Sequence, residues 1–410
     1  MKSATSLSAS FSAPLFAFLS APSFALFLAA ISSLFMSFPA AAQVTVSLAD
    51  VPAPQVAARA YVLFDASSGQ TLAQQAATDR FEPASLTKLM TAYLVFQALK
   101  DKKLTLTQTL PVSERAWRAE GSRMFIDPKQ APAVEPLIRG MIVQSGNDAS
   151  IALAEAVAGS EDLFAQLMNK QAKLLGMKNT NFVNATGLPH PQHYSTAEDL
   201  AILANALIRD FPTEVGYYKE REFTHNKITQ PNRNRLLWLD PTVDGLKTGH
   251  TEAAGYCLIA TAKRSTGGDA DKSRRLISVV LGTTSDVART QESQKLLNYG
   301  YQFFDAQRLY KKNEPIATPE IFKGTQSAIK LGFDRDIWLT LPKDKFTGLK
   351  ATLVTAQPLI APYSPGQKAG VMKLTQNDKL IAEVPVVALE NVPVAGFLGR
   401  GWDAIRLLLK

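Results

Sequence analysis

The structure of this chain is organised around Phe81-Glu-Pro-Ala-Ser-Leu-Thr-Lys-Leu-Met-Thr-Ala-Tyr93. Pro83 is compatible with the first turn of a helix, because the N–H that it lacks has no helical partner there. Ser85 therefore falls in the first turn, at the positive end of the helix dipole. Lys88 follows three residues later, on the same side of the helix. The apolar residues recur at the spacing of one helical face and predict an amphipathic helix: Leu86, Leu89, Met90, Tyr93 and Leu94.

The Ser85–Lys88 pair has two interpretations. A buried lysine close to a second cation can lose its proton near neutral pH. The neutral amine can then take the proton of a serine hydroxyl and make the serine a nucleophile. Alternatively, the pair belongs to a polar first turn from which the lysine reaches solvent. The spacing alone favours the polar turn, because Ser-x-x-Lys is a common sequence. The rest of the chain has to discriminate between them.

The first 42 residues differ in composition from the rest of the chain. Lys2 is their only charged residue, and an Ala-, Phe-, Leu- and Ser-rich run follows it and ends at Ala40-Ala41-Ala42. This order predicts a signal peptide over residues 1–42, cleaved after Ala42, and therefore export. An uncleaved N-terminal anchor is the alternative, because the apolar region is longer than usual.

Charge and cysteine content limit the kinds of ligand. The formal net charge is +8, or +7 (8 − 1) without Lys2. This balance favours anionic lipid surfaces, acidic polymers or carboxylate substrates. We expect no nucleic-acid partner, given export and the absence of any run of five basic residues. Cys257 is the only cysteine, and its apolar surroundings predict a buried, inert thiol without a disulfide.

Residues 43–309 are predicted to form an α/β layered domain, an antiparallel sheet with helices packed on it. A β-rich start, a helical middle and a return of strands produce this expectation, and polar capping residues precede two of the helices. The predicted strands are residues 60–65, 70–74, 222–223, 245–247, 256–261 and 276–281, and the predicted helices are residues 137–143, 149–158, 161–175, 196–209 and 291–304.

Two smaller pieces follow. Residues 310–395 show short alternating runs between turns, typical of a small all-β domain. They contain no histidine or cysteine, so a spacer or binding role fits them better than catalysis. Residues 396–410 predict an amphipathic helix of about 22 Å, shorter than a ~30 Å hydrocarbon core. This helix can lie in a membrane interface, or alternatively dock on the β domain. Its apolar residues are Phe397, Leu398, Trp402, Ile405, Leu408 and Leu409.

Two further motifs bear on Ser85. Ser145-Gly146-Asn147 lies between two predicted helices, where a hydroxyl and a carboxamide could relay a proton and hold a substrate amide. Lys247-Thr248-Gly249-His250 lies on a predicted strand, where the lysine and threonine could bind a carboxylate. Gly249 would leave room for a substrate along the strand edge. The simpler alternatives are an ordinary polar turn and an exposed edge strand with a protective lysine.

Ser-x-x-Lys, Ser-x-Asn and Lys-Thr-Gly, in this order, are the signature of the penicillin-recognising serine enzymes. The similarity extends through residues 82–93, 144–155, 232–238 (N-R-N-R-L-L-W) and 243–251 (V-D-G-L-K-T-G-H-T). With the layout of the chain, these segments resemble the exported D-alanyl-D-alanine carboxypeptidases among the low-molecular-mass penicillin-binding proteins. The resemblance covers nearly the whole mature chain and implies a β-lactamase/transpeptidase-like catalytic domain.

The resemblance implies a catalytic role for several motif residues. Ser85 would attack the carbonyl of the penultimate D-Ala and form an acyl-enzyme, with Lys88 as its base. Ser145, helped by Lys247, would pass the proton to the departing D-Ala. Asn147 would bond the amide side of the substrate. Water would then hydrolyse the acyl-enzyme, and no metal or other cofactor is expected.

The resemblance also implies binding roles and partners. Thr248 would hold the terminal carboxylate, and Arg233 and Arg289 would strengthen the positive field around it. The backbone N–H groups of Ser85 and His250 would form the oxyanion hole. The implied partners are the pentapeptide stems of peptidoglycan, β-lactams as covalent inhibitors, and a membrane surface contacted by the C-terminal helix. The implied location is periplasmic, at the outer face of the cytoplasmic membrane.

Three alternatives remain open at this point. A serine β-lactamase shares the motifs but adds a glutamate for deacylation, and Glu198 looks like a helix first-turn residue rather than that base. A D,D-endopeptidase of the same fold is the second alternative. A non-catalytic peptidoglycan-binding protein is the third. The sequence does not determine the preferred form of peptidoglycan, side activities as transpeptidase or β-lactamase, or the oligomeric state.

Overall fold

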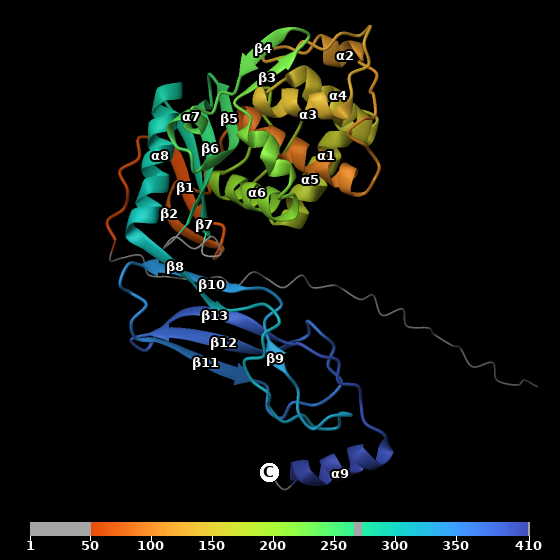
Figure 1. Ribbon diagram of the computed structural model, residues 1–410, viewed down its shortest axis with the longest axis vertical. Coiled ribbons are helices and arrows are strands. Elements are labelled where there is room, and N and C mark those ends of the chain that lie inside the picture. Colours follow the sequence, from red (N-terminus) through yellow and green to blue (C-terminus); the bar gives the residue numbers. More distant parts are fainter. Residues whose placement is uncertain (1–50, 266–272, 409–410) are drawn as a thin grey trace, which may run out of the picture. The chain divides into compact units, whose positions relative to one another are not determined.

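The computed structural model describes residues 51–265 and 273–408, so the predicted signal peptide, residues 1–42, lies outside the described residues. Five antiparallel strands form the central sheet, in the order β2-β1-β7-β6-β5 (Figure 1). The predicted hairpin supplies β1 and β2, whereas the other three strands enter after the helical middle of the chain. The strands are β1 (Ala60–Asp65), β2 (Gln70–Gln75), β5 (Val243–Thr251), β6 (Gly255–Ser265) and β7 (Ser273–Thr283).

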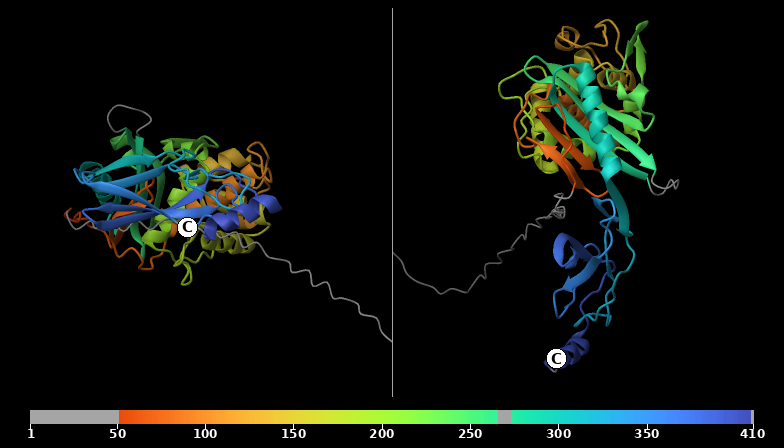
Figure 2. Two further views of the ribbon diagram at one scale, coloured as in Figure 1. Left: turned by 90° about the horizontal axis from the view of Figure 1, so that it is seen from below. Right: turned by 90° about the vertical axis from the view of Figure 1, so that its left-hand side faces the viewer.

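Both faces of this sheet are buried. Tyr61 and Leu63 of β1 pack in one core with Leu297 of α8 (Asp286–Phe303), whereas Val62 belongs to the core shared with the other helices. Figures 1 and 2 show α8 on one face of the sheet and the remaining large helices on the other. Because successive side chains of a strand point to opposite faces, the same apolar strands contribute side chains to the core on each face of the sheet. The predicted α/β layered fold is confirmed.

The predicted helix around Ser85 lies at the centre of the helical layer. It begins as a 3₁₀ turn, Ala84–Thr87, and continues as α1 (Lys88–Lys100). Ten of the 13 residues of α1 are buried, so the prediction of a single apolar face is wrong. The reason is that four helices pack around α1, and Thr91 and Val95 are therefore as buried as the predicted stripe. These helices are α3 (Val134–Val143), α4 (Asn147–Ala158), α5 (Glu161–Leu175) and α6 (Ala197–Asp210).

Side-chain caps set the starts of three of the longer helices. Ser160, Thr196 and Ser285 each accept a hydrogen bond from the backbone N–H three residues later, at the starts of α5, α6 and α8. Ser160 confirms the polar cap expected before residues 161–175, whereas α6 is capped by Thr196, which was expected inside the helix. The predicted start of α8 at residue 291 is wrong. The cap at Ser285 starts the helix several residues before the apolar pattern begins. The remaining short elements are α2 (Glu114–Trp117), the 3₁₀ turn Glu214–Lys219, β3 (Glu222–His225), β4 (Ile228–Pro231) and α7 (Leu236–Leu239).

Beyond α8 the chain forms a second core made of strands. β8 pairs with β10, and a four-stranded sheet has the order β11-β12-β13-β9. Phe333, Leu339, Leu374 and Val386 are buried in a hydrophobic cluster of their own. This arrangement confirms the predicted small all-β domain. Its strands are β8 (Phe304–Tyr310), β9 (Leu331–Gly332), β10 (Ile337–Pro342), β11 (Leu349–Thr355), β12 (Lys368–Gln376) and β13 (Lys379–Ala388).

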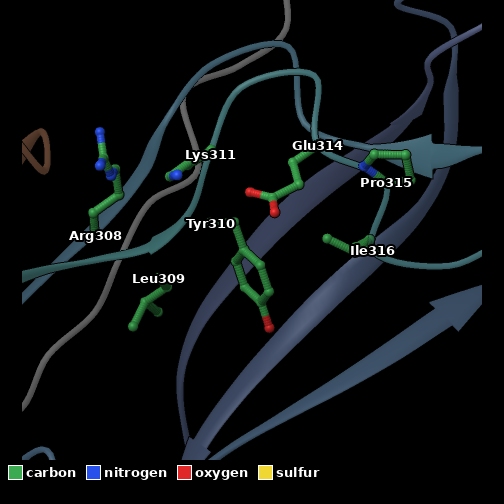
Figure 3. A pocket seen from close by; sticks show the side chains of 7 residues that line it. All are labelled: Arg308, Leu309, Tyr310, Lys311, Glu314, Pro315 and Ile316. Carbon is green, nitrogen blue, oxygen red and sulfur yellow. The ribbon is translucent and has the colours of Figure 1, made fainter.

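A pocket of about 480 Å³ opens where β8 runs into the following turn (Figure 3). Arg308, Tyr310, Lys311 and Glu314 are among the residues that line it. Arg308 already pairs with Asp336, at 3.1 Å. None of the motif residues lines this pocket, so it belongs to the β domain and not to the predicted site.

The C-terminal residues form α9 (Phe397–Leu408), as predicted. Its apolar side chains are exposed, and Leu398 keeps 86% of its surface accessible. Its polar side contacts the β domain: Asp403 accepts a hydrogen bond from the backbone N–H of Lys323, and Arg406 pairs with Glu320. The helix thus contacts the β domain, as the alternative expected, but through its polar side, and its apolar side stays exposed. No helix in the described part of the chain combines the length and the apolar content needed to span a bilayer.

Candidate active site

The three predicted motifs meet at one place. Ser85 lies in the 3₁₀ turn, Lys88 is the first residue of α1, and Asn147 is the first residue of α4. Lys88 Nζ lies 3.0 Å from Ser85 Oγ and 2.7 Å from Asn147 Oδ1. Lys247 and Gly249 lie on β5, which is an edge strand of the sheet and packs on the 3₁₀ turn.

Three acceptors surround the amine of Lys88. Besides Ser85 Oγ and Asn147 Oδ1, the backbone carbonyl of Thr186 lies 2.6 Å from Nζ. An ammonium group has three donors, whereas a neutral amine has two donors and one lone pair. The oxygens of Asn147 and Thr186 can only accept, so the neutral amine must donate to both. Its lone pair is then left for the hydroxyl of Ser85.

Burial prepares Lys88 for this neutral form. Its pKa is lowered to about 7, mainly by burial and then by the positive charge of Arg233, while Asp148 and Glu161 act in the opposite direction. The neutral amine is therefore accessible near neutral pH. Lys88 is only 1% exposed. The interpretation as a polar turn with a solvated lysine is therefore wrong.

A backbone turn that the sequence did not reveal presents the Thr186 carbonyl. Asn184 Oδ1 accepts hydrogen bonds from Thr186 N, Thr186 Oγ1 and Gly187 N, at 3.1, 3.0 and 2.7 Å. These bonds fix the turn and hence the direction of the carbonyl. The Asn-x-Thr-Gly sequence is a turn signal, but a main-chain oxygen leaves no side-chain signature from which its role could be predicted.

His193 fastens the same turn to the 3₁₀ turn of Ser85. Its Nδ1 accepts from the backbone N–H of Val183 at 3.0 Å, so Nε2 carries the proton and donates to Thr87 Oγ1 at 2.8 Å. Burial is the main reason that the pKa of His193 falls to about 4. The imidazole is thus neutral at neutral pH and acts as a bridge between two backbone segments.

Ser145 has an unusual environment. Its backbone is left-handed, with φ of 66°, which is strained for a residue other than glycine. The side chain is buried, and its Oγ has no hydrogen-bond partner within residues 51–265 and 273–408. A buried, unpaired hydroxyl is unfavourable unless a ligand satisfies it. The strain and the unpaired oxygen together mark a functional position.

Asn147 is held from the opposite side. Its Nδ2 donates to the carbonyl of Glu120 at 2.6 Å, and its backbone N–H donates to the carbonyl of Ser122 at 2.6 Å. The first bond orients the carboxamide with its oxygen toward Lys88. Asp148 fixes the next turn of the same loop, because its carboxylate accepts from the backbone N–H groups of residues 124–126.

Lys247 lies on the edge strand but is not exposed. It is 3% exposed, and its Nζ donates to the carbonyl of Thr248 at 3.1 Å. Its pKa is well below the ordinary value because of burial and because Lys88, Arg233 and Arg289 are positively charged. An exposed edge strand with a protective lysine is therefore not what the structure shows.

The structural reason for glycine at position 249 differs from the predicted reason. A Cβ at this position would lie 3.2 Å from Leu86 Cγ, 3.2 Å from the carbonyl of Pro83 and 3.3 Å from Ala84 Cβ. The missing side chain thus lets β5 pack on the turn that carries Ser85, and the expectation that it leaves room for a substrate is corrected. Thr248 is buried beside it, and His250 is exposed at the end of β5.

Two arginines border the strand. Arg289 on α8 is buried and donates to the carbonyl of Gly249 at 3.2 Å, and its Nε has no partner within the described residues. Arg233 is exposed, and its loop is tied to β5 by Asn234, whose Nδ2 donates to the carbonyl of Gly245 at 3.0 Å. Burial lowers the pKa of the Arg289 guanidinium group. Within the described ranges, no three His, Cys, Asp or Glu side chains are grouped to hold a metal ion.

The fold and the site define a class of protein. A serine beside a buried lysine of lowered pKa, an inter-helix Ser-x-Asn loop and a Lys-Thr-Gly edge strand are features of serine enzymes that work through acyl intermediates. Sequence comparison narrows the class. Residues 47–285 match the family of D-alanyl-D-alanine carboxypeptidases, and residues 304–394 match the C-terminal domain of penicillin-binding protein 5. The chain belongs to the D-alanyl-D-alanine carboxypeptidase family and is a serine-type carboxypeptidase.

Relatives and solved structures agree with this assignment. The D-alanyl-D-alanine carboxypeptidase DacC of Escherichia coli (strain K12) is 45% identical over 365 residues, which cover 87% of this chain and 90% of the relative. Penicillin-binding protein 5 from Haemophilus influenzae has a TM-score of 0.78 and 40% identity, covering 84% of this chain and 99% of its own. Penicillin-binding protein D2 from Listeria monocytogenes, solved in the ampicillin bound form, has a TM-score of 0.55 and 33% identity, covering 61% and 100%.

These findings confirm the predicted family, fold class and enzyme class. They also bear on the alternatives. Glu198, considered as the base of a β-lactamase, lies exposed in the first turn of α6. The family assignment favours a carboxypeptidase over an endopeptidase or a binding protein.

Proposed function

We propose that this carboxypeptidase removes the terminal D-Ala from pentapeptide stems of peptidoglycan through an acyl-enzyme at Ser85. The observation that carries the proposal is the hydrogen bonding of Lys88. Two of its contacts can only accept, so the lone pair of the neutral amine is left for Ser85 Oγ, 3.0 Å away. A base in this position can take the serine proton as the nucleophile attacks.

Acylation then follows from the geometry. Lys88 takes the proton of Ser85, and Oγ forms a bond to the carbonyl carbon of the penultimate D-Ala. The electron pair of the carbonyl moves onto its oxygen. The backbone N–H groups of Ser85 and His250 are the donors that we assign to this oxyanion. When the tetrahedral intermediate collapses, the C–N bond to the terminal D-Ala breaks.

The departing amine needs a proton. Ser145 Oγ is buried without a partner in the described residues and can bond a substrate group, and its proton can pass to the amine nitrogen. The proton that Lys88 took from Ser85 then replaces the one lost from Ser145, and Lys247 helps this transfer. Water then adds to the ester carbon, the bond to Ser85 Oγ breaks, and the shortened peptide leaves.

The proposed binding residues complement the negative charge of the substrate's terminal carboxylate. The terminal carboxylate of the peptide would be held by Thr248, within the positive field of Lys247, Arg233 and Arg289. Asn147 would bond the amide on the other side of the reacting carbon. The same serine would be acylated by β-lactams, which is supported by the ampicillin bound form of the Listeria monocytogenes relative.

We place the enzyme in the periplasm, at the outer face of the cytoplasmic membrane. Residues 1–42 have the composition of a cleaved signal peptide. The exposed apolar side chains of α9 include Leu398 and Trp402, and they suit the interface of a lipid bilayer. These features support export and attachment to the membrane surface.

A labelling experiment tests the proposal. The mature protein is incubated with a fluorescent penicillin, and D-Ala release from a D-Ala-D-Ala-terminated peptide is followed in parallel. We expect a lasting adduct and D-Ala release, both absent in Ser85→Ala. An adduct that disappears within seconds would instead indicate a β-lactamase. A lasting adduct without D-Ala release would indicate an endopeptidase or transpeptidase, and no adduct at all would refute the serine mechanism.

A further inference from the structure

Two exposed aromatic side chains, each beside an arginine, lie on the chain segment that contacts Asn147, and we name Trp117, Arg118, Arg123 and Phe125 the rim. Trp117 and Phe125 are 43% and 42% exposed. The guanidinium carbon of Arg118 lies 5.9 Å from the ring centre of Trp117, and that of Arg123 lies 5.1 Å from the ring centre of Phe125. Each ring is thus paired with a cation.

The rim is joined directly to Asn147. The carbonyls of Glu120 and Ser122, which lie between its two aromatic residues, accept both hydrogen bonds that Asn147 donates. Gly121 lies so close that a Cβ there would be 3.0 Å from Asn147 Nδ2. The chain segment that carries the rim is therefore the one that positions Asn147.

Phe125 is held in place against its own preference. Its φ is 67°, in the left-handed region that bulky side chains avoid. Asp148 Oδ2 accepts the backbone N–H of Phe125 at 2.8 Å, and Gln230 of the β3–β4 hairpin donates to the carbonyl of Arg123 at 3.2 Å. Because the ring is 42% exposed, core packing does not explain the strain.

The charges of the rim are available to a ligand. Arg123 has no ion pair within the described ranges. Arg118 pairs only with Glu114, at 2.8 Å, and both side chains are about 70% exposed. Such exposed pairs contribute little and exchange readily. A carboxylate of a ligand could therefore bond either guanidinium group.

We propose that the rim binds the glycan and peptide beyond the two D-alanyl residues, so that the enzyme prefers polymeric, anionic peptidoglycan strands to short peptides. This inference rests on the proposed function. Sugar rings present C–H faces that stack on Trp117 and Phe125, and the carboxylates of stem and sugar acids suit Arg118 and Arg123. Aromatic and arginine side chains are the residues that most often dominate binding surfaces.

Two substrates test the proposal: a short D-Ala-D-Ala-terminated tripeptide and soluble peptidoglycan strands with pentapeptide stems. The variants are Trp117→Ala, Arg123→Gln and Phe125→Gly, and the last removes the ring at a position whose φ suits glycine. We expect kcat/KM for D-Ala release from strands to fall about ten- to a hundredfold in the aromatic variants. The value for the tripeptide should stay within about twofold.

Trp238→Ala is the matched control, because Trp238 is 45% exposed and Arg221 lies over its ring at 5.9 Å. This variant should leave kcat/KM for both substrates unchanged. Equal losses on both substrates would show that the rim only supports Asn147, and the absence of any loss would show that it binds nothing; either result overturns the proposal. Failure of the proposed function is distinguishable, because the unaltered enzyme would then release no D-Ala from either substrate.

Discussion

At the scale of single residues, the environment of Lys88 combines burial with three oxygen contacts. Burial makes the neutral amine accessible near neutral pH. The oxygens of Asn147 and Thr186 take its two N–H donors, so its lone pair is directed to Ser85. Neither effect is sufficient alone. A neutral lysine without Asn147 and Thr186 could turn its lone pair elsewhere, and a charged lysine in the same place could only donate to Ser85.

The first prediction concerns pH. Because the pKa of Lys88 is lowered to about 7, its neutral fraction rises as pH increases through 7. We expect the second-order rate of acylation by a penicillin to rise through this range and to level off about one unit above it. Stopped-flow labelling between pH 5 and 9 measures the profile. Lys88→Arg, which stays protonated, should be slower by about 10²–10⁴-fold. A flat profile in the unaltered enzyme would contradict the assignment of Lys88 as base.

The second prediction concerns Asn184. Asn184→Ala removes the acceptor of three hydrogen bonds, so the Thr186 carbonyl loses its fixed direction. We expect slower acylation and a loss of about 1–3 kcal/mol in the free energy of unfolding, measured by urea titration.

Asn184→Asp is the matched control, because one carboxylate oxygen can accept the same three bonds. Its negative charge should raise the pKa of Lys88 and move the pH profile of acylation upward. If both variants acylate as fast as the unaltered enzyme, the turn does not position Lys88.

At the scale of elements, the site is a junction between a helix start and a strand edge. β5 is fully paired on one side only, with β6, and its Gly249 packs on the 3₁₀ turn before α1. This contact sets the distance between the Ser85 turn and the Lys247 strand. The geometry of the site therefore depends on the packing of two elements as well as on its side chains.

The third prediction follows from this contact. The Cβ of Gly249→Ala would need its neighbours to move by a few tenths of an ångström, whereas Gly249→Val cannot fit without separating β5 from the turn. We expect a modest loss of acylation rate in the alanine variant and a large loss in the valine variant. Acylation kinetics and thermal unfolding are measured together. Full activity of Gly249→Val would show that the close packing is not needed.

At the scale of the whole molecule, hydrogen bonds link the sheet to the β domain. Asp65 Oδ2 of β1 accepts from Arg274 Nε of β7 and from Thr340 Oγ1 of β10, each at 2.7 Å. Asp65 and Arg274 are buried. A buried charge is destabilising without a partner, because its hydration by water has been lost.

The fourth prediction tests this link. Asp65→Asn leaves Arg274 buried without a counter-charge and should lower the free energy of unfolding by about 3–5 kcal/mol. Thr340→Val removes the hydrogen bonds of Thr340 Oγ1 with Asp65 and Ser68 and should lower the free energy of unfolding by about 1–2 kcal/mol. Urea unfolding followed by fluorescence measures both changes. If Asp65→Asn lowers the free energy of unfolding by less than Thr340→Val does, the ion pair contributes no net stability.

The fifth prediction concerns attachment to membranes. Leu398→Glu places a charge on the exposed apolar side of α9 and should reduce binding to anionic lipid vesicles by at least about tenfold. Leu380→Glu is the matched control, because Leu380 is an exposed leucine of β13 outside α9. Vesicle sedimentation measures the binding, and D-Ala release should be unchanged in both. Equal binding of Leu398→Glu and the unaltered protein would rule out α9 as the contact.

Much of the architecture could be predicted because local chemistry determines it. The hairpin of β1 and β2, the cap at Ser160 and the alternating strands of the β domain all depend on neighbouring residues. The motifs around Ser85, Asn147 and Lys247 were recognisable for the same reason, since each occupies a few adjacent positions. The single apolar face of α1 was wrong because a local pattern does not show how many helices surround it.

The sequence by itself determined the three motifs, their order, and the succession of catalytic core, β domain and amphipathic helix. The tertiary structure alone decided which contacts make Lys88 a base and why residue 249 is glycine. Thr186 contributes a backbone carbonyl, and Gly249 a missing Cβ beside Pro83 and Leu86. Main-chain oxygens and close approaches between distant segments have no local sequence pattern, because they arise only when those segments pack together.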